Sequence, residues 1–347
     1  MNSKSVASSV WRWSYMLSLL LIVLVLGACS DIPQEGGRIE TLVVTSTRLP
    51  ASEIAGTLNQ EAVAVTSVPT AESVSAAVSL GGEEDDVAEG DPQARRPLAP
   101  GEWMDLPVVP EIDAHARQIF EAGIASGNDP KVFAKVGDCQ NVPSLFLSIF
   151  DYPGYYSLGD EYEYLQRTID WYSGSFVRES EAVRRGFNAA SVVSPVWADP
   201  ETCESGETPL ACEIRVSNPS VAIISLETWW AGKPENYEKY VRQIIEGLLE
   251  EDILPIVATK ADNLEGDHQI NEILVRLANE YQIPVWNFWK AVQPLPGNGL
   301  MEDEFHLTFD DNHFDDPDVM KSAWPWRNLT ALQVLDAVYT ELISTQQ

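Results

Sequence analysis

Three residues that lie far apart in the sequence have the side chains that nucleophilic catalysis requires. Cys139 follows residues 132–136, a short and mostly apolar run typical of a buried strand. Asp303 and His306 lie three residues apart near the end of the chain. A thiol at a strand-to-loop turn can attack a carbonyl when an imidazole takes its proton, and a nearby carboxylate can orient that imidazole. The sequence therefore contains the parts of a Cys-His-Asp arrangement.

Each of these assignments has an alternative in the sequence. The alternative for Cys139 is a small buried side chain with ordinary packing, and the adjacent Asp138 would repel a thiolate. His313 forms a second Asp-x-x-His motif with Asp310, although Phe305 and Leu307 around His306 suit a strand end better. The acidic segment 310–318 could hold calcium, but its spacing matches no calcium loop that we recognise, and we predict neither a metal nor a cofactor.

The motifs around Cys139 and His306 resemble blocks of the SGNH/GDSL hydrolase family. That family has Gly-Asp-Ser after its first strand, where this chain has Gly137-Asp138-Cys139, and Asp-x-x-His before its last helix. The resemblance covers most of the span from about residue 130 to about residue 340. It implies that Cys139 is the nucleophile, that Asp303 and His306 are the base pair, and that the amides of Cys139 and Gly186 bind the oxyanion.

The chain departs from the family pattern at two positions. The nucleophilic serine is replaced by Cys139, and the family's Gly-x-Asn-Asp block reads Glu227-Thr228-Trp229-Trp230 here. The resemblance implies that Trp229 stands where an asparagine donates to the oxyanion, and loss of one such donor costs roughly 3 to 4 kcal/mol of transition-state stabilisation. Two hypotheses follow: an ester or thioester hydrolase, and a catalytically degenerate fold that binds carbohydrate or another envelope component.

Polar and aromatic side chains are expected at the same ligand edge. We assign substrate-binding roles to Asp138, Trp230, Lys260, Asp262 and Asn263. A βα loop also needs turn formers and a helix cap, which is the competing explanation for the last three. Adjacent tryptophans can stack on sugar rings, although consecutive side chains diverge and one of the two can pack in the core. The family resemblance implies acylated carbohydrate or lipid substrates.

The elements that must position these residues alternate between strands and helices. Apolar runs predict strands at 132–136, 221–226, 253–259 and 285–288, and helical patterns cover 161–171, 235–250, 269–281 and 326–343. This alternation predicts an α/β fold, a flavodoxin-like three-layer α/β/α sandwich with a mostly parallel sheet. Ligands of such sheets bind beyond the carboxyl ends of the strands.

The N-terminus has the features of an export signal. Lys4 and Arg12 precede an apolar run that ends in Leu26-Gly27-Ala28-Cys29, which is short for a transmembrane span and resembles a bacterial lipobox. We predict a signal peptide at 1–28, acylation of Cys29, an acidic low-complexity linker at 29–100 and a hydrolase-like domain at 101–347. An uncleaved anchor is the alternative. Either way the domain lies on the extracytoplasmic side of a bacterial cell membrane.

Charge and cysteine content limit the partners further. Lys plus Arg is 22 and Asp plus Glu is 53, and the net charge of −31 excludes a nucleic-acid partner. Membrane contact should come from the lipid on Cys29. Cys203 and Cys212 lie in a turn-rich segment and are expected to form a disulfide, which leaves Cys139 as a thiol. His115 and His268 are interpreted as isolated surface histidines.

Overall fold

The structure is a computed structural model that describes residues 95–226 and 233–344. The expected signal peptide, Cys29, most of the linker, Trp229 and Trp230 lie outside the described residues, so the predictions about them stay predictions. Among the described residues, no helix combines the length and the apolar character needed to cross a bilayer.

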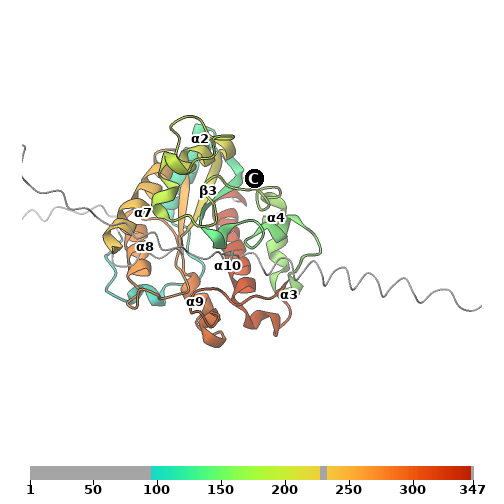
Figure 1. Ribbon diagram of the computed structural model, residues 1–347. Helices are drawn as coiled ribbons and strands as arrows, with labels where there is room; N and C mark the ends of the chain where they lie inside the picture. Colours follow the sequence, from blue (N-terminus) through green and yellow to red (C-terminus); the bar gives the residue numbers. More distant parts are fainter. Residues whose placement is uncertain (1–94, 227–232, 345–347) are drawn as a thin grey trace, which may run out of the picture. The chain divides into compact units, whose positions relative to one another are not determined.

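Four parallel strands form the main sheet of the described chain (Figure 1). Their order across the sheet is β1 (Asp129–Gly137), β3 (Pro219–Ser225), β4 (Leu254–Ala258) and β5 (Val285–Trp286). Each pair is parallel, and Gly137 at the end of β1 is in register with Ser225 at the end of β3. The strands overlap the runs predicted from the sequence, although β1 and β3 begin earlier, and the α/β fold class is confirmed.

A turn of the chain lies beside the end of β1. Residues 180–183 form this turn, in which Val183 N donates to Ser180 O at 3.0 Å, and Val183 makes an isolated parallel bridge with Gly137. The Gly137 amide donates to Ala182 O at 3.1 Å, and Ser180 Oγ donates to Lys135 O at 2.7 Å. These contacts fasten the turn to the edge of the sheet beside β1.

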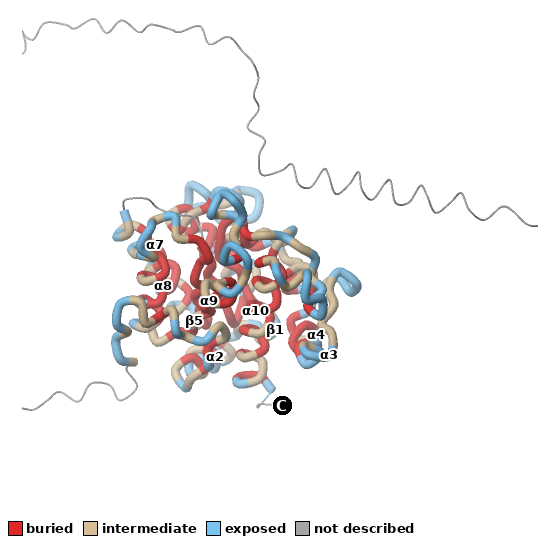
Figure 2. The backbone as a smooth tube through the Cα atoms, turned by 90° about the horizontal axis from the view of Figure 1, so that it is seen from below, coloured by how far each residue is buried: buried red, intermediate tan, exposed pale blue. Residues whose placement is uncertain are grey.

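Side chains alternate between the two faces of the sheet, and each face has its own apolar core. On β3, Val221 and Ile223 belong to one core, and Ala222 and Ile224 belong to the other. This is the period-2 pattern of a strand covered on both faces. Figure 2 shows buried backbone at the centre, surrounded by intermediate and exposed segments.

Helices cover both faces. The helices that contribute to the first core are α2 (Ala114–Ser126), α4 (Gln166–Trp171), α9 (Phe288–Val292) and α10 (Ala323–Val338). The second core is covered by α5 (Ala189–Val192), α6 (Pro209–Ser217), α7 (Pro234–Leu249) and α8 (Gln269–Glu280). The result is the three-layer sandwich predicted from the sequence.

Short elements connect these layers. Helix α3 (Gly159–Tyr162) precedes α4, a π-helical turn η8 (Tyr339–Ile343) follows α10, and β2 (Tyr156–Ser157) pairs with β6 (Asn312–His313) outside the main sheet. The 3-10 helices are η1 (Glu102–Asp105), η2 (Cys139–Asn141), η3 (Ser148–Asp151), η4 (Glu163–Leu165), η5 (Pro195–Trp197), η6 (Pro296–Gly299) and η7 (Val319–Lys321).

Several predicted boundaries need correction. The helix expected at 161–171 is broken into α3, η4 and α4, and the strand expected at 285–288 stops at Trp286 because Asn287 caps α9. The segment interpreted as turn-rich around Cys203 and Cys212 ends inside α6. There Thr208 caps the helix through Ala211 N, and Pro209 occupies its first position.

Candidate functional site

Cys139 opens a tight turn at the carboxyl end of β1. The Asp138 carboxylate caps η2 by accepting from Gln140 N at 3.1 Å, and the Asn141 amide donates to Ser225 O at 2.7 Å. Gly137 must be glycine here, because a Cβ would overlap the Asn141 amide and lie 2.5 Å from Ser225 O. The turn that presents Cys139 is therefore fastened to the end of the neighbouring strand β3.

The immediate surroundings of Cys139 are partly closed. Cys139 is half-buried and keeps its thiol, whereas Asp138 is only 1% exposed. The Asp138 carboxylate points to the Gln140 amide, and its expected repulsion of a Cys139 thiolate stays a prediction. The roles of Cys139 as nucleophile and Asp138 as a substrate contact stay predictions.

His306 and Asp303 form a hydrogen-bonded pair. His306 Nδ1 lies 2.5 Å from Asp303 Oδ2, and Asp303 Oδ1 accepts from the backbone amides of Phe305 and His306 at 3.1 and 2.9 Å. The hydrogen bond from the His306 ring, followed by that from its amide, lowers the pKa of Asp303 to about 2. With Nδ1–H held by the carboxylate, Nε2 is the ring atom that can accept a proton.

The His306 loop is anchored to the start of α10. Met301 N donates to His306 O at 2.8 Å, and Thr308 O accepts from the amides of Ala323 and Trp324 at 3.1 and 3.0 Å. The side chains of His306 and Asp303 are 46% and 49% exposed, so the pair lies at the surface. In Figure 1, α9 and the orange-red loops that follow it occupy the lower end of the fold.

A buried arginine connects α10 with the Cys139 turn. Arg327 is fully buried, and its Nη2 donates to Ser225 Oγ at 2.7 Å, on the same residue whose carbonyl binds Asn141. Four aromatic rings surround the guanidinium at 5.0 to 5.8 Å: Phe146, Trp286, Phe288 and Trp324. Helix α10 thus touches both the His306 loop and the strand end beside Cys139.

The second Asp-x-x-His motif is arranged differently. His313 lies in β6, opposite Ser157 of β2, and its side chain is exposed. The described structure gives His306 a hydrogen bond between its ring and the carboxylate of Asp303. In the second motif, the Asp310 carboxylate accepts from the backbone amide of Asp311. His306 is therefore the better supported of the two candidates.

Gly186 lies just beyond the edge of the sheet. It follows Val183, the residue that bridges Gly137, by three positions, and Cys139 follows Gly137 by two. Its φ of +84° favours glycine, and a Cβ would meet nothing within 4 Å. Its role as an oxyanion donor, like that of Trp229, stays a prediction.

Lys260, Asp262 and Asn263 build the loop between β4 and α8. Lys260 Nζ lies 2.6 Å from Asp262 Oδ1 and 2.7 Å from Glu265 Oε2, and Lys260 and Asp262 are each 1% exposed. Asn263 Oδ1 accepts from His268 N at 2.8 Å. These contacts are those of a loop-forming network, and the substrate-binding roles assigned to the three residues stay predictions.

The interpretation of His268 as an isolated surface histidine is wrong. Its ring lies 5.8 Å from the Trp103 ring and 5.7 Å from the Trp289 ring, and its Nδ1 is buried. The Trp103 indole donates to Glu272 Oε1 at 2.9 Å. No spacing in the sequence indicates this cluster, because its members come from three distant segments. His115 is half-buried on α2.

Two grooves of the described surface lie away from the candidate residues. One of about 660 Å³ runs along α8, where Leu98, Trp103 and Arg276 line it, and a second of about 560 Å³ shares Arg95 and Leu98 with it. None of the lining residues is a predicted catalytic residue. We therefore place the candidate site at the Asp303–His306 pair and not in either groove.

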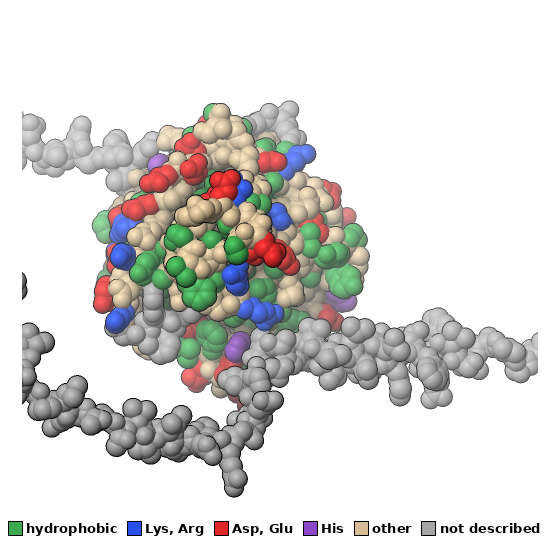
Figure 3. All heavy atoms as spheres, turned by 45° about the horizontal axis from the view of Figure 1, so that its top comes forward, with side chains coloured by type: hydrophobic (Ala, Val, Ile, Leu, Met, Phe, Trp, Pro, Cys, Tyr) green, Lys and Arg blue, Asp and Glu red, His purple; other side chains and the backbone are tan. Residues whose placement is uncertain are grey.

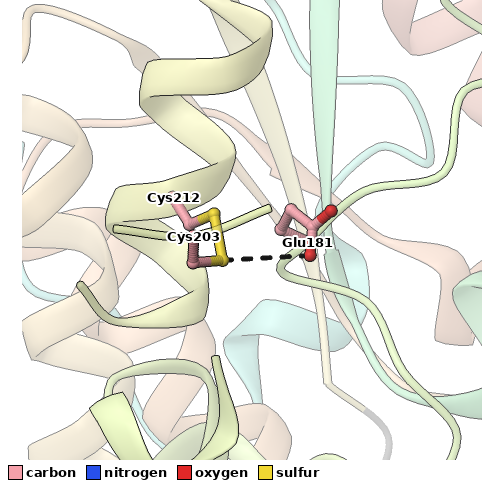
Figure 4. A group of neighbouring side chains, drawn as sticks. All are labelled: Glu181, Cys203 and Cys212. Atoms are coloured by element: carbon pink, nitrogen blue, oxygen red, sulfur yellow. Dashed lines mark hydrogen bonds between the residues drawn. A yellow bond between two sulfur atoms is a disulfide. The ribbon is translucent and has the colours of Figure 1, made fainter. Parts of the chain in front are cut away.

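The expected disulfide is present. Cys203 and Cys212 are joined across a Cα–Cα distance of 5.2 Å, and Figure 4 shows Glu181 facing the bridge, with its carboxylate 4.0 Å from Cys203 Sγ. Burial is the main cause that raises the pKa of Glu181. Among the described residues these three side chains are grouped closely enough to suggest a metal, but sulfurs that are bonded to each other are not thiolate ligands.

Comparisons with known proteins give little. No protein-family model and no curated protein matches the chain. A solved structure assigned to the G-D-S-L lipolytic family, from Desulfitobacterium hafniense DCB-2, is similar at 15% identity and a TM-score of 0.33. The match covers 59% of this chain and 99% of that one. The fold assignment rests on the sheet and its helices, and the similarity is too slight to support a function.

Proposed function

We propose that this chain is an extracytoplasmic, lipid-anchored protein of SGNH/GDSL type that hydrolyses ester or thioester bonds, with Cys139 as its nucleophile. The observation that carries the proposal is the hydrogen bond between His306 Nδ1 and Asp303 Oδ2, on a loop anchored to α10. Lipid anchoring is supported by the Leu26-Gly27-Ala28-Cys29 motif alone.

The proposed reaction has two steps. Cys139 Sγ attacks the carbonyl carbon while His306 Nε2 takes the thiol proton and passes it to the leaving alkoxide or thiolate. The acyl group is then bound to Cys139 as a thioester. Water, deprotonated by His306, attacks this thioester and releases the carboxylic acid and the thiol. Asp303 keeps the imidazole oriented throughout, and the amides of Cys139 and Gly186 are the proposed oxyanion donors.

A binding protein is the second candidate function. The buried Asp138 beside Cys139 disfavours a thiolate, and the Asp303–His306 pair is about half exposed instead of being enclosed. Both features are compatible with a site that no longer performs chemistry and holds an envelope carbohydrate.

Hydrolysis of p-nitrophenyl esters from acetate to octanoate, by the full-length chain in detergent, tests the proposal. Cys139→Ala and His306→Gln should each lower kcat/KM by about 100-fold or more, because each removes a group that acts in the transition state. The matched control is His313→Gln, which should retain activity.

Two results would contradict hydrolysis by the native protein. One is equal activity of the wild type and Cys139→Ala. The other is activity that appears only in Cys139→Ser, which would show that the scaffold is sound but that the native thiol does not hydrolyse esters.

A further inference from the structure

The loop that carries Gly186 also holds a guanidinium against an aromatic surface. Arg184 Nη1 donates to Trp197 O at 3.2 Å, and its Cζ lies 5.2 Å from the centre of the Phe187 ring. The Phe187 and Trp197 rings meet edge to face, with centroids 6.3 Å apart. Arg184, Phe187 and Trp197 therefore form one packed unit on either side of α5.

Two consecutive apolar side chains of the segment that carries Trp197 face solvent. Val196 is 87% exposed and Trp197 is 51% exposed, whereas Phe187, whose ring meets that of Trp197, is 1% exposed. Both belong to η5, whose first position is Pro195, so the backbone that presents them has one φ angle already fixed. A firmly held and half-exposed indole is a common anchor in binding sites.

Two arginines lie beside this surface. Arg184 and Arg185 are adjacent and exposed in a chain whose net charge is −31. The Arg184 side chain is 43% exposed, and its carboxylate neighbour Asp199 is 3.9 Å away, which is a loose pairing. A guanidinium has five N–H donors in a planar fork, so donors remain for a carboxylate ligand.

This surface is close in the sequence to residues of the candidate site. Gly186 directly follows Arg184 and Arg185, and Val183 pairs with Gly137 at the end of β1. On the face shown in Figure 3, apolar, basic and acidic side chains are interspersed.

We propose that Arg184, Val196 and Trp197, named here the Trp197 shelf, bind a hexuronate residue of an acidic polysaccharide. The indole stacks on the apolar face of the pyranose ring, and the Arg184 guanidinium pairs with the carboxylate of the sugar. An open shelf suits a polymer that continues past it on both sides. The inference deepens the proposed function, since it names the substrate class that the shelf would bring to Cys139, but binding itself does not require the thiol.

Binding is measured by calorimetry on the full-length Cys139→Ala chain. The probes are tetramers of galacturonate and of mannuronate, each also in its fully methyl-esterified form. We expect at least one acidic tetramer to bind at least tenfold more tightly than its methyl ester. Trp197→Ala should weaken that binding at least tenfold, and Arg184→Gln should abolish the preference for the acidic form.

The control variant is Tyr155→Ala, which removes a ring that is 70% exposed on a different segment and should leave binding unchanged. The inference is overturned if neither acidic tetramer binds, or if Trp197→Ala and Arg184→Gln bind as Cys139→Ala does. The Cys139→Ala chain used for calorimetry lacks the thiol, and the p-nitrophenyl esters contain no sugar. Failure of the tetramers to bind the shelf and failure of the wild type to hydrolyse esters are therefore separate results.

Discussion

The two oxygens of the Asp303 carboxylate make different hydrogen bonds, and a substitution can separate their effects. Its Oδ1 caps the amides of Phe305 and His306, and its Oδ2 binds the His306 ring. Asparagine keeps an oxygen for the cap but no longer provides the charge that orients and stabilises the imidazolium. The sequence predicted this pair from its three-residue spacing, because such a spacing lets a carboxylate reach both the backbone and the ring.

Asp303→Asn is expected to lower kcat/KM for p-nitrophenyl acetate by about 100-fold with little change in stability. Since the pKa of Asp303 is about 2, the carboxylate of the wild type is ionised throughout the range from pH 4 to pH 8, and the effect should be similar across that range. A variant as active as the wild type would show that Asp303 is only a turn cap.

Lys135 is a second residue with a measurable electrostatic effect. It is fully buried in β1, and its Nζ donates to Phe176 O at 2.9 Å. Burial lowers the pKa of Lys135 to about 7, with Arg178 acting in the same direction and with Glu213, Asp151 and Glu179 opposing it.

Between about pH 7 and pH 10.5 the unfolded chain therefore holds a proton on Lys135 that the folded chain has released. The free energy of unfolding should rise with pH in that window, by up to about 1.4 kcal/mol per pH unit. Urea denaturation should show a smaller rise for Lys135→Met than for the wild type. The exposed Lys239→Met serves as the control and should keep the wild-type slope, and equal slopes for all three proteins would refute this assignment.

At the scale of elements, the turn from β1 into η2 is the most constrained part of the candidate site. Gly137→Ala would place a methyl group against the Asn141 amide and Ser225 O, so it should loosen the contact that fastens the turn to β3. We expect a loss of about 2 to 3 kcal/mol in the free energy of unfolding, measured with urea, together with loss of ester hydrolysis.

Gly247→Ala is the matched control for that variant. Gly247 lies within helix α7, and a Cβ there would meet only the flexible end of the Leu210 side chain at 3.3 Å. Alanine should be neutral or slightly stabilising at this position. If Gly137→Ala is equally neutral, the turn is not constrained in the way described.

The elements also show what the sequence could and could not predict. Strands β1, β3, β4 and β5 were predictable because both of their faces are covered, which makes each strand a short apolar run. Helix α6 was missed because its cap and first proline resemble a turn in isolation. The ring of aromatic side chains around Arg327, and the packing of His268 between Trp103 and Trp289, depend on segments that meet only after folding.

At the scale of the whole molecule, the disulfide fixes the segment that carries the Trp197 shelf. One end of that segment is held by residues 180–183 on the sheet, and the other by the bond from Cys203 to Cys212 in α6. The double variant Cys203→Ser and Cys212→Ser should lower the free energy of unfolding by about 2 to 3 kcal/mol through loop entropy. Urea denaturation would measure this loss. An unchanged midpoint would show that the bridge does not contribute to stability.

Cys139 and the Asp303–His306 pair are proposed to act together, although 164 positions separate Cys139 from Asp303 in the sequence. The most direct measurement is the rate at which iodoacetamide alkylates Cys139 at pH 7, followed by mass spectrometry of the peptide that contains it. If an imidazole assists the thiol, the wild type should react at least about tenfold faster than His306→Gln, with His313→Gln reacting like the wild type. Equal rates in the wild type and His306→Gln would contradict the claim.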